Sequence, residues 1–397
     1  MKGGNFLASG TYGCAYYPSL RCYGEDERKD LVSKIMTKHD ALDELEKEEE
    51  IRKIDPNQQF SIYTVSSCIP GHIDKTSDNS LKDCPSTIIS KSDFNKYTGM
   101  WKNDKYMLSA PFSTLVEFKE LLKNQPNSNL DIEKQASERN NQLTKPPGSL
   151  GRLEELAIWY SSWRGELAPK LRSPQVVVFA GNHGVTAQGI SAFPSEVTQQ
   201  MVINFQHGGA AINQLCKAFG AKLDVIALDL DKPTADFTTG PAMSEAECVK
   251  ALTIGWNAVD KSTDLFVAGE MGIGNTTSAA AISHALYGGS AIDWVGRGTG
   301  IDDIGLEKKA QVVATSLISN PTSTKNGIEA LRCLGGRELA AMAGSIASAR
   351  AKSIPVILDG FICSAAAACL ENTIPGSLDH CTAGHVSSEN AHRALLE

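Results

Sequence analysis

The sequence contains no long apolar run, no paired cysteine motif and no excess of basic charge. No stretch approaches the ~18 apolar residues needed to cross a bilayer. The first ten residues, MKGGNFLASG, lack the apolar core of a secretory signal. The ten cysteines are scattered without a Cys-x-x-Cys pair, which favours reduced thiols in a cytoplasmic protein over disulfides or a zinc site. A net charge of -8 argues against a broad nucleic-acid-binding surface.

The composition changes along the 397 residues, which predicts separate domains. Residues 1–122 are rich in Lys, Asp, Asn, Ser and Tyr, whereas residues 130–397 are rich in Ala, Gly, Val and Ile. Between them, residues 123–129 (KNQPNSN) have the composition of a linker, because Pro, Asn and Ser offer little surface to bury.

Residues 130–397 alternate between short apolar runs and helix-like stretches. Predicted strands begin at Val176, Leu223, Asp264, Ala291 and Pro355. Predicted helices include EVTQQMVINF, TTSAAAISHAL and ELAAMAGSIASARA, whose Ala and Ser content indicates close helix packing. The alternation predicts an α/β, Rossmann-like parallel sheet with helices on both faces. Ligands of such sheets bind beyond the carboxyl ends of the strands, where this sequence is polar or rich in glycine.

The segment GEMGIGNTT, Gly269–Thr277, joins a predicted strand to a predicted helix. Asn275, Thr276 and Thr277 are natural helix-capping residues, and free amides at a helix start bind anions. A phosphate site and a tight turn made of small residues are both consistent with this pattern. Glu270, a carboxylate beside an anion site, would serve a ribose hydroxyl or a heterocycle N–H.

The other strand-end loops carry further candidate residues. GRGTGID, Gly296–Asp302, is not a dinucleotide fingerprint, which disfavours an NAD-dependent oxidoreductase. Arg297 and Lys309 can neutralise a phosphate or remain solvated surface charges. His183 is a base, a hydrogen-bond donor or a plain loop residue. Asp359 caps a helix or holds ribose hydroxyls.

Eight segments occur together and in order: KPPGSLGRLE, NHGV…GISAFP, GGAAIN, GEMGIGNTTSAAA, GRGTGID, GGRELAAMAG, PVILDGF and GHVSSE. This set resembles the nicotinate-nucleotide–dimethylbenzimidazole phosphoribosyltransferase family over about residues 130–397. The resemblance implies a Rossmann-like homodimer without metal or redox cofactor. The implied reaction, part of cobalamin biosynthesis, transfers phosphoribose from nicotinate mononucleotide to 5,6-dimethylbenzimidazole and gives α-ribazole 5′-phosphate and nicotinate.

The resemblance also assigns residues. The implied 5′-phosphate clamp consists of Gly272, Asn275, Thr276, Gly296, Gly298 and Lys309. Glu270 matches a strand-end glutamate near the substrates and is a possible assisting catalytic group. Asn182 and His183 match an Asp-His pair of some members, and His385 matches the histidine before a late Ser-x-Glu segment.

The family places its general-base glutamate in a Gly-Glu-Gly-Ser-Gly segment, which by this comparison lies beyond Glu397. We therefore expect a domain truncated at its C-terminus. Three possibilities stay open: an active enzyme, a nucleotide-binding pseudoenzyme without the base, and a chimeric sequence assembled from two incomplete genes.

The opening LASGTYGCAYYP resembles the glycine loop of protein kinases, particularly those of large DNA viruses. By this resemblance, Lys34 would pair with phosphates, and Glu48, Glu49 or Glu50 would be its helix partner in a small α+β N-lobe. The sequence has no His-Arg-Asp, Asp-Phe-Gly or Ala-Pro-Glu motif, and these motifs supply the base and metal ligands. Kinase activity is therefore not expected.

Overall fold

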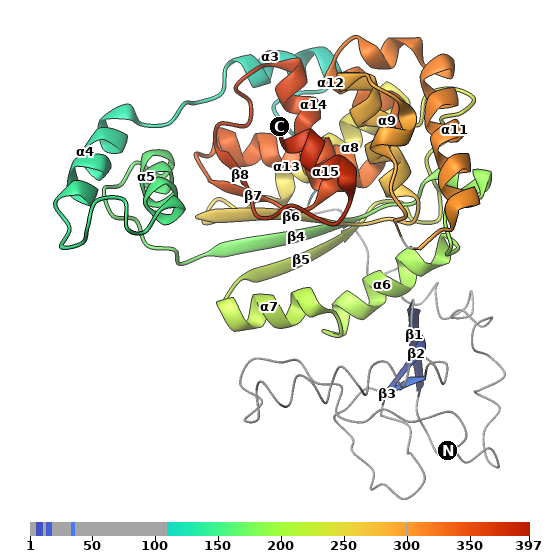
Figure 1. Cartoon of the computed structure of the whole chain (residues 1–397), viewed down its shortest axis with the longest axis horizontal. Coiled ribbons are helices and arrows are strands. Elements are labelled where there is room, and N and C mark those ends of the chain that lie inside the picture. Colours follow the sequence, from blue (N-terminus) through green and yellow to red (C-terminus); the bar gives the residue numbers. More distant parts are fainter. Residues whose placement is uncertain (1–4, 11–12, 18–32, 36–105, 107–108, 299) are drawn as a thin grey trace, which may run out of the picture. The chain divides into compact units, whose positions relative to one another are not determined.

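The computed structural model describes residues 5–10, 13–17, 33–35, 106, 109–298 and 300–397, which form two units divided after Gly99 (Figure 1). In the first unit, β1 (Asn5–Gly10), β2 (Gly13–Tyr17) and β3 (Ser33–Ile35) form an antiparallel sheet. The tip of the kinase-like glycine loop and Glu48, Glu49 and Glu50 lie outside the described residues. The kinase-like assignment therefore stays a prediction.

The second unit contains a five-stranded parallel sheet in the order β5-β4-β6-β7-β8. Its strands are β4 (Pro174–Ala180), β5 (Lys222–Ala227), β6 (Leu265–Met271), β7 (Val356–Leu358) and β8 (Cys381–Ala383). The predicted parallel α/β sheet is confirmed. The strands beginning at Val176, Leu223, Asp264 and Pro355 correspond to β4, β5, β6 and β7.

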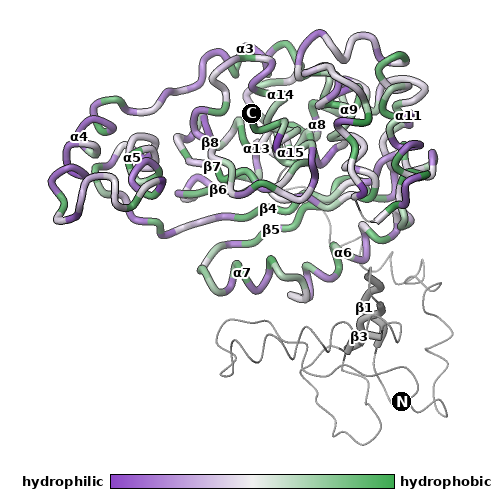
Figure 2. The backbone as a smooth tube through the Cα atoms, viewed as in Figure 1, coloured by the Kyte–Doolittle hydropathy of each residue, from purple (hydrophilic) through white to green (hydrophobic). Residues whose placement is uncertain are grey.

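Apolar side chains cover both faces of this sheet, because successive residues of a strand point to opposite faces. Phe179 of β4 belongs to the large core cluster, whereas the next residue, Ala180, belongs to a smaller cluster with Val202 of α6 (Glu196–Gln206). α6 and α7 (Ala211–Phe219) lie on one side of the sheet, and α8 (Glu245–Ala258), α13 (Arg337–Ala351) and α14 (Phe361–Thr373) lie on the other (Figure 1). In Figure 2, α6 and α7 alternate between hydrophobic and hydrophilic residues, as expected of helices that cover a sheet with one face.

The helices pack closely where glycine removes the side chain. A Cβ atom at Gly255 of α8 would lie 1.8 Å from the carbonyl oxygen of Ala341, and one at Gly344 of α13 would lie 2.1 Å from that of Leu252. The backbones of α8 and α13 therefore touch, which confirms the close helix packing predicted from the small residues of the stretch that forms α13.

Two short elements differ from the prediction. The run at Ala291 forms the helix α10 (Ala291–Trp294), because Ser290 and Asp293 make a capping box in which the Ser290 N–H donates to Asp293 Oδ2 at 3.1 Å. The fifth strand is instead β8, whose three residues are too few and too polar to indicate a strand by pattern.

Further helices complete the second unit. They are α3 (Leu115–Lys123), α4 (Leu130–Asn141), α5 (Arg152–Arg164), η3 (Gly184–Gln188), α9 (Asn275–Tyr287), α11 (Asp303–Ser319), η4 (Pro321–Thr324), α12 (Gly327–Leu334) and α15 (Asn390–Leu396). In α3, Phe118 and Leu122 are buried in the large core, although the predicted boundary assigned them to the first segment. Among the described residues, no helix is long and apolar enough to cross a membrane.

Candidate active site

The carboxyl ends of the strands bring the predicted loops to one edge of the sheet. Ala180 of β4 pairs with Met271 of β6, and the N–H of Gly181 donates to the Met271 carbonyl at 3.0 Å. The loops after β4 and β6 therefore start side by side. The third loop of this edge follows Leu358 of β7, which pairs with Ala268 of β6.

Lys309 of α11 lies at the centre of the predicted phosphate clamp. Its side chain is only 1% exposed, and its Nζ donates to Thr276 Oγ1 at 2.7 Å and to the Gly296 carbonyl at 3.0 Å. Gly298 has a φ of 51°, which residues with a side chain rarely adopt, and a Cβ atom there would lie 3.1 Å from Thr276 Oγ1, so a larger residue would be strained here. We call the group of Thr276, Gly296, Gly298 and Lys309 the anion cradle. Burial lowers the pKa of Lys309 to about 8, which the nearby Glu389 charge opposes.

A carboxylate of the protein occupies part of the anion cradle. Glu389, the residue before α15, accepts a hydrogen bond from the Gly298 N–H at 3.2 Å through Oε1. Its Oε2 would lie 1.5 Å from a Cβ atom at Gly296, so Glu389 enters the space that this glycine leaves open. The cradle therefore already binds a carboxylate in this structure.

Glu270 lies near the end of β6 and is partly buried beside the cradle-bearing helix α9. The Asn275 side-chain amide donates to Glu270 Oε2. Burial raises the pKa of Glu270 to about 7; the Glu338 charge and, more weakly, Asp359 add to the rise, and the Asn275 bond opposes it. Because Asn275 follows the N-cap and its side chain bonds to Glu270, the prediction that it caps α9 is wrong. Gly274 is the N-cap in a left-handed conformation with φ of 93°, and no side chain caps the helix.

His183 and Asn182 follow β4 and are both buried. His183 Nε2 bonds to Glu338 Oε1, and Nδ1 is 2.9 Å from Ser278 Oγ. Asn182 Nδ2 donates to the Leu230 carbonyl at 2.8 Å, while its Oδ1 has no hydrogen-bond partner among the described residues. His183 thus connects the loop after β4 to α13 and to α9. It is therefore not the plain loop residue that one of the interpretations allowed.

Asp359 and His385 lie at the end of β7 and after β8, and both are exposed. Asp359 Oδ1 and His385 Nδ1 are 4.0 Å apart. Asp359 does not cap α14, because the N-cap is Gly360 and no side chain caps the helix. Asp359 remains available to a polar ligand such as ribose.

A family model for phosphoribosyltransferases matches residues 126–397. The chain is 60% identical over 290 residues to the nicotinate-nucleotide–dimethylbenzimidazole phosphoribosyltransferase of Roseobacter denitrificans, covering 73% of this chain and 86% of that protein. The chain belongs to this family. Identity to the Ruegeria pomeroyi enzyme of the same name is 62% over 282 residues, 71% of this chain and 83% of that protein. A crystal structure of the Thermus thermophilus enzyme of that name is similar, with a TM-score of 0.63 and 38% identity over 68% of this chain and 85% of that chain.

In this phosphoribosyltransferase, two buried or partly buried acids were missed by the site prediction. Glu338 lies in GGRELAAMAG and Glu389 in GHVSSE, two of the segments that carried the resemblance. Their position in those segments could have identified them. They were missed because candidate residues were sought at the ends of predicted strands, and neither residue follows such a strand. Arg297, by contrast, pairs with Asp303 on the surface, as expected of a solvated charge.

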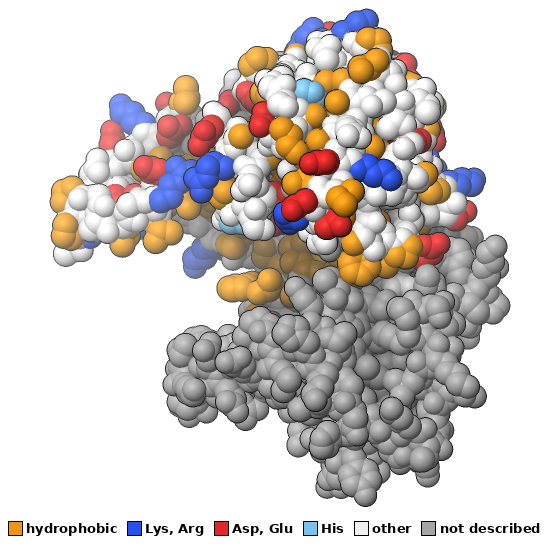
Figure 3. All heavy atoms as spheres, turned by 45° about the vertical axis from the view of Figure 1, so that its right-hand side comes forward, with side chains coloured by type: hydrophobic (Ala, Val, Ile, Leu, Met, Phe, Trp, Pro, Cys, Tyr) orange, Lys and Arg blue, Asp and Glu red, His pale blue; other side chains and the backbone are white. Residues whose placement is uncertain are grey.

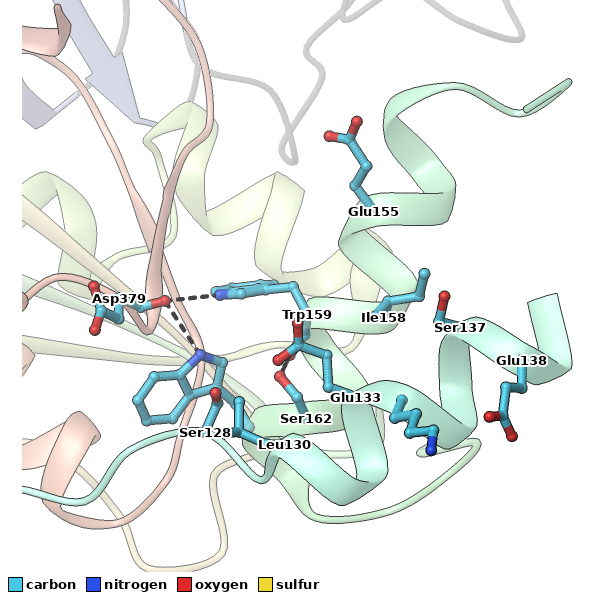
Figure 4. A pocket seen from close by; sticks show the side chains of 12 residues that line it. Ser128, Leu130, Glu133, Ser137, Glu138, Glu155, Ile158, Trp159, Ser162 and Asp379 are labelled. Carbon is cyan, nitrogen blue, oxygen red and sulfur yellow. Dashed lines mark hydrogen bonds between the residues drawn. The ribbon is translucent and has the colours of Figure 1, made fainter. Parts of the chain in front are cut away.

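A separate hollow of about 720 Å³ lies between α4 and α5 (Figure 4). The indole N–H groups of Trp159 and Trp163 both donate to the Asp379 carbonyl, at 3.0 and 3.1 Å. None of the predicted site residues of the phosphoribosyltransferase lines this hollow.

On the face in Figure 3, acidic and basic side chains of the described residues are interspersed. Among the described residues, no group of three or more His, Cys, Asp or Glu is arranged to bind a metal.

Proposed function

We propose that this chain transfers the phosphoribosyl group of nicotinate mononucleotide to 5,6-dimethylbenzimidazole, giving α-ribazole 5′-phosphate and nicotinate. The named relatives support the reaction, since identity to them extends over more than four-fifths of each protein. The observation that carries the assignment is the anion cradle, in which the buried ammonium of Lys309 bonds to Thr276 and the amide of Gly298 binds a carboxylate.

The anion cradle suits the 5′-phosphate of the nucleotide. Backbone N–H groups and a lysine are the donors that phosphate binds, and the start of α9 adds the favourable field of a helix N-terminus. The Glu389 carboxylate already accepts the Gly298 N–H that a phosphate oxygen would need. We infer that the incoming phosphate displaces Glu389 and takes over its hydrogen bond.

Fixing the phosphate fixes the ribose between the two bases. The bond from C1′ to the pyridinium nitrogen breaks, and its electron pair neutralises that nitrogen. A benzimidazole nitrogen bonds to C1′ from the opposite face and inverts it, as the implied α product requires. Holding the two rings on opposite sides of C1′ supplies much of the rate enhancement, because a bimolecular step becomes effectively unimolecular.

In the proposed reaction, Glu270 receives the proton that the benzimidazole N–H gives up. A carboxyl with a pKa of about 7 is well matched to a proton transfer near neutral pH. This is the assisting role predicted for it. The general-base glutamate that the resemblance places beyond Glu397 stays a prediction, as do the homodimer, which light scattering tests, and the cytoplasmic location.

The phosphate assignment is tested by calorimetry with nicotinate mononucleotide and with its riboside, which lacks the phosphate. We expect Lys309→Met to weaken nucleotide binding by roughly 10- to 100-fold, the usual cost of losing a charged hydrogen bond. Riboside binding should change little. The neighbouring Lys308 is exposed, so Lys308→Met is the matched control. Equal nucleotide binding by the Lys309 and Lys308 variants would contradict the assignment.

A further inference from the structure

Glu338, in the first turn of α13, forms a buried chain of polar side chains behind the candidate active site. Its Oε1 bonds to His183 Nε2, and His183 Nδ1 bonds to Ser278 Oγ at 2.9 Å. All three side chains are 0% exposed. They come from α13, the loop after β4 and helix α9, so the chain joins three elements beneath the edge of the sheet.

One oxygen of this buried acid has no partner. Glu338 Oε2 makes no hydrogen bond to any of the described residues, although the great majority of buried polar atoms in proteins make one. A buried carboxylate with a free oxygen is costly to maintain. A residue that served only to pack α13 would have no reason to keep this cost, so the free oxygen points to a role in the reaction.

Glycines hold Glu338 close to the backbone of the site. A Cβ atom would lie 2.3 Å from Oε2 at Gly181 and 2.5 Å from it at Gly336. At Gly272, a Cβ atom would lie 3.0 Å from Glu338 Oε1 and 3.3 Å from Asn275 Nδ2, the amide that donates to Glu270. The carboxylate of Glu338 and the Asn275–Glu270 pair therefore lie on either side of Gly272, close to its backbone.

We propose that Glu338 is a positioning residue of the phosphoribosyl transfer: fixed by His183, its charge keeps the neighbouring Glu270 carboxyl basic enough to take the benzimidazole proton. This inference rests on the proposed function. In the step concerned, the benzimidazole nitrogen bonds to C1′, the bond to nicotinate breaks with its electron pair, and the N–H proton passes to Glu270. Glu338 touches neither substrate and acts through Glu270.

The groups that face Glu270 decide the direction of the effect. Glu338 of α13 and Asp359 after β7 are like charges that favour the protonated form, whereas Asn275 of α9 donates to the charged form. The Cys363 thiol of α14 has its pKa raised to about 12 by burial and stays neutral. His183 faces Glu338 and holds it in place. Burial of Glu270 remains without Glu338, so removing the Glu338 charge lowers the pKa of Glu270 only in part.

The test compares the full chain with Glu338→Gln, which keeps the shape and removes the charge. Glutamate carboxyl groups are labelled with ¹³C and titrated by NMR, and the Glu270 signal is assigned by its loss in Glu270→Gln. The parent should titrate near pH 7, and Glu338→Gln should titrate at a clearly lower pH. Glu247 pairs with Arg337, the residue next to Glu338, so Glu247→Gln is the matched control and should leave the inflection unchanged.

The pH profile of nicotinate release provides the second readout. In Glu338→Gln, the acidic limb of kcat/KM should move to lower pH and kcat should fall by roughly tenfold, with KM for the nucleotide unchanged. A purely structural role would lower activity at every pH without moving the limb. An unchanged Glu270 inflection in the folded variant overturns the proposal.

Two further outcomes are separable. If Glu338→Gln does not fold, Glu338→Asp, which withdraws the charge by one methylene, should lower the Glu270 inflection by a smaller amount, and no shift at all overturns the proposal. If the parent titrates as expected but releases no nicotinate, the proposed function fails, and with it the role of Glu338 in the reaction. If nicotinate is released and the inflection does not respond to Glu338, only the present inference fails.

Discussion

The ammonium of Lys309 lies 2.7 Å from the hydroxyl of Thr276 and thereby ties α11 to the first turn of α9. The bond spans 33 residues of sequence and is shielded from solvent, since Lys309 is 1% exposed. Lys309 has no salt bridge within the part of the chain that the structure describes, and burial favours its neutral form and lowers its pKa to about 8. An incoming phosphate would supply the missing partner.

This pKa predicts how nucleotide binding depends on pH. Lys309 is charged below about pH 8 and loses its charge as the pH rises through that value. The affinity for nicotinate mononucleotide should therefore be highest below pH 8 and decline above it. Calorimetric titrations on both sides of pH 8 measure this, and Lys309→Met should show no such decline. A parent affinity that rises above pH 8 would argue against a role for the ammonium.

Turnover should depend on pH through Glu270 as well. The carboxyl must be ionised to accept a proton, so kcat/KM should rise as the pH increases through about 7 and fall again as Lys309 deprotonates near 8. The expected profile is a narrow bell. In Glu270→Gln the rising limb should disappear, and a limb that persists in this variant would assign it to another group.

Removing the internal anion should strengthen substrate binding. Glu389 accepts the Gly298 N–H and competes with a phosphate for the anion cradle. Glu389→Gln keeps the size of the side chain and removes its charge, so nicotinate mononucleotide should bind several-fold more tightly, about 1 kcal/mol. Glu307→Gln, on the exposed side of α11, is the control. Weaker binding by Glu389→Gln would mean that Glu389 helps to hold the substrate instead.

The backbone contact between α8 and α13 should be sensitive to a single methyl group. Because a Cβ atom at Gly344 would lie 2.1 Å from the Leu252 carbonyl oxygen, Gly344→Ala must push the helices apart. We expect a loss of about 1–3 kcal/mol in the free energy of unfolding. Gly240, where a Cβ atom would meet nothing within 4 Å, provides Gly240→Ala as the control in the same denaturant titration. Equal stability of the two variants would contradict the packing.

The sequence was sufficient to predict the strands that are long and apolar. Val176, for example, begins a run of β-branched and aromatic residues that becomes the buried strand β4. Two short elements were not predicted, because α10 is decided by the local Ser290–Asp293 capping box and β8 by pairing with β7. Neither signal is visible in hydrophobic periodicity.

The sequence was sufficient to predict which loops form the site, but not which of their side chains contact one another. The pattern placed Glu270 and Thr276 at a strand end and a helix start, where the structure has them. It could not show that Lys309 is buried, since a lone lysine on a helix is usually solvated. The contact between His183 and Glu338 joins residues 155 positions apart, and such a pairing depends on the tertiary fold.

The central claim is tested most directly by incubating the full chain with nicotinate mononucleotide and 5,6-dimethylbenzimidazole and measuring both products by chromatography. The account predicts that nicotinate and α-ribazole 5′-phosphate form in equal amounts, and that Lys309→Met greatly reduces both. Tight nucleotide binding with no α-ribazole 5′-phosphate formed would contradict it.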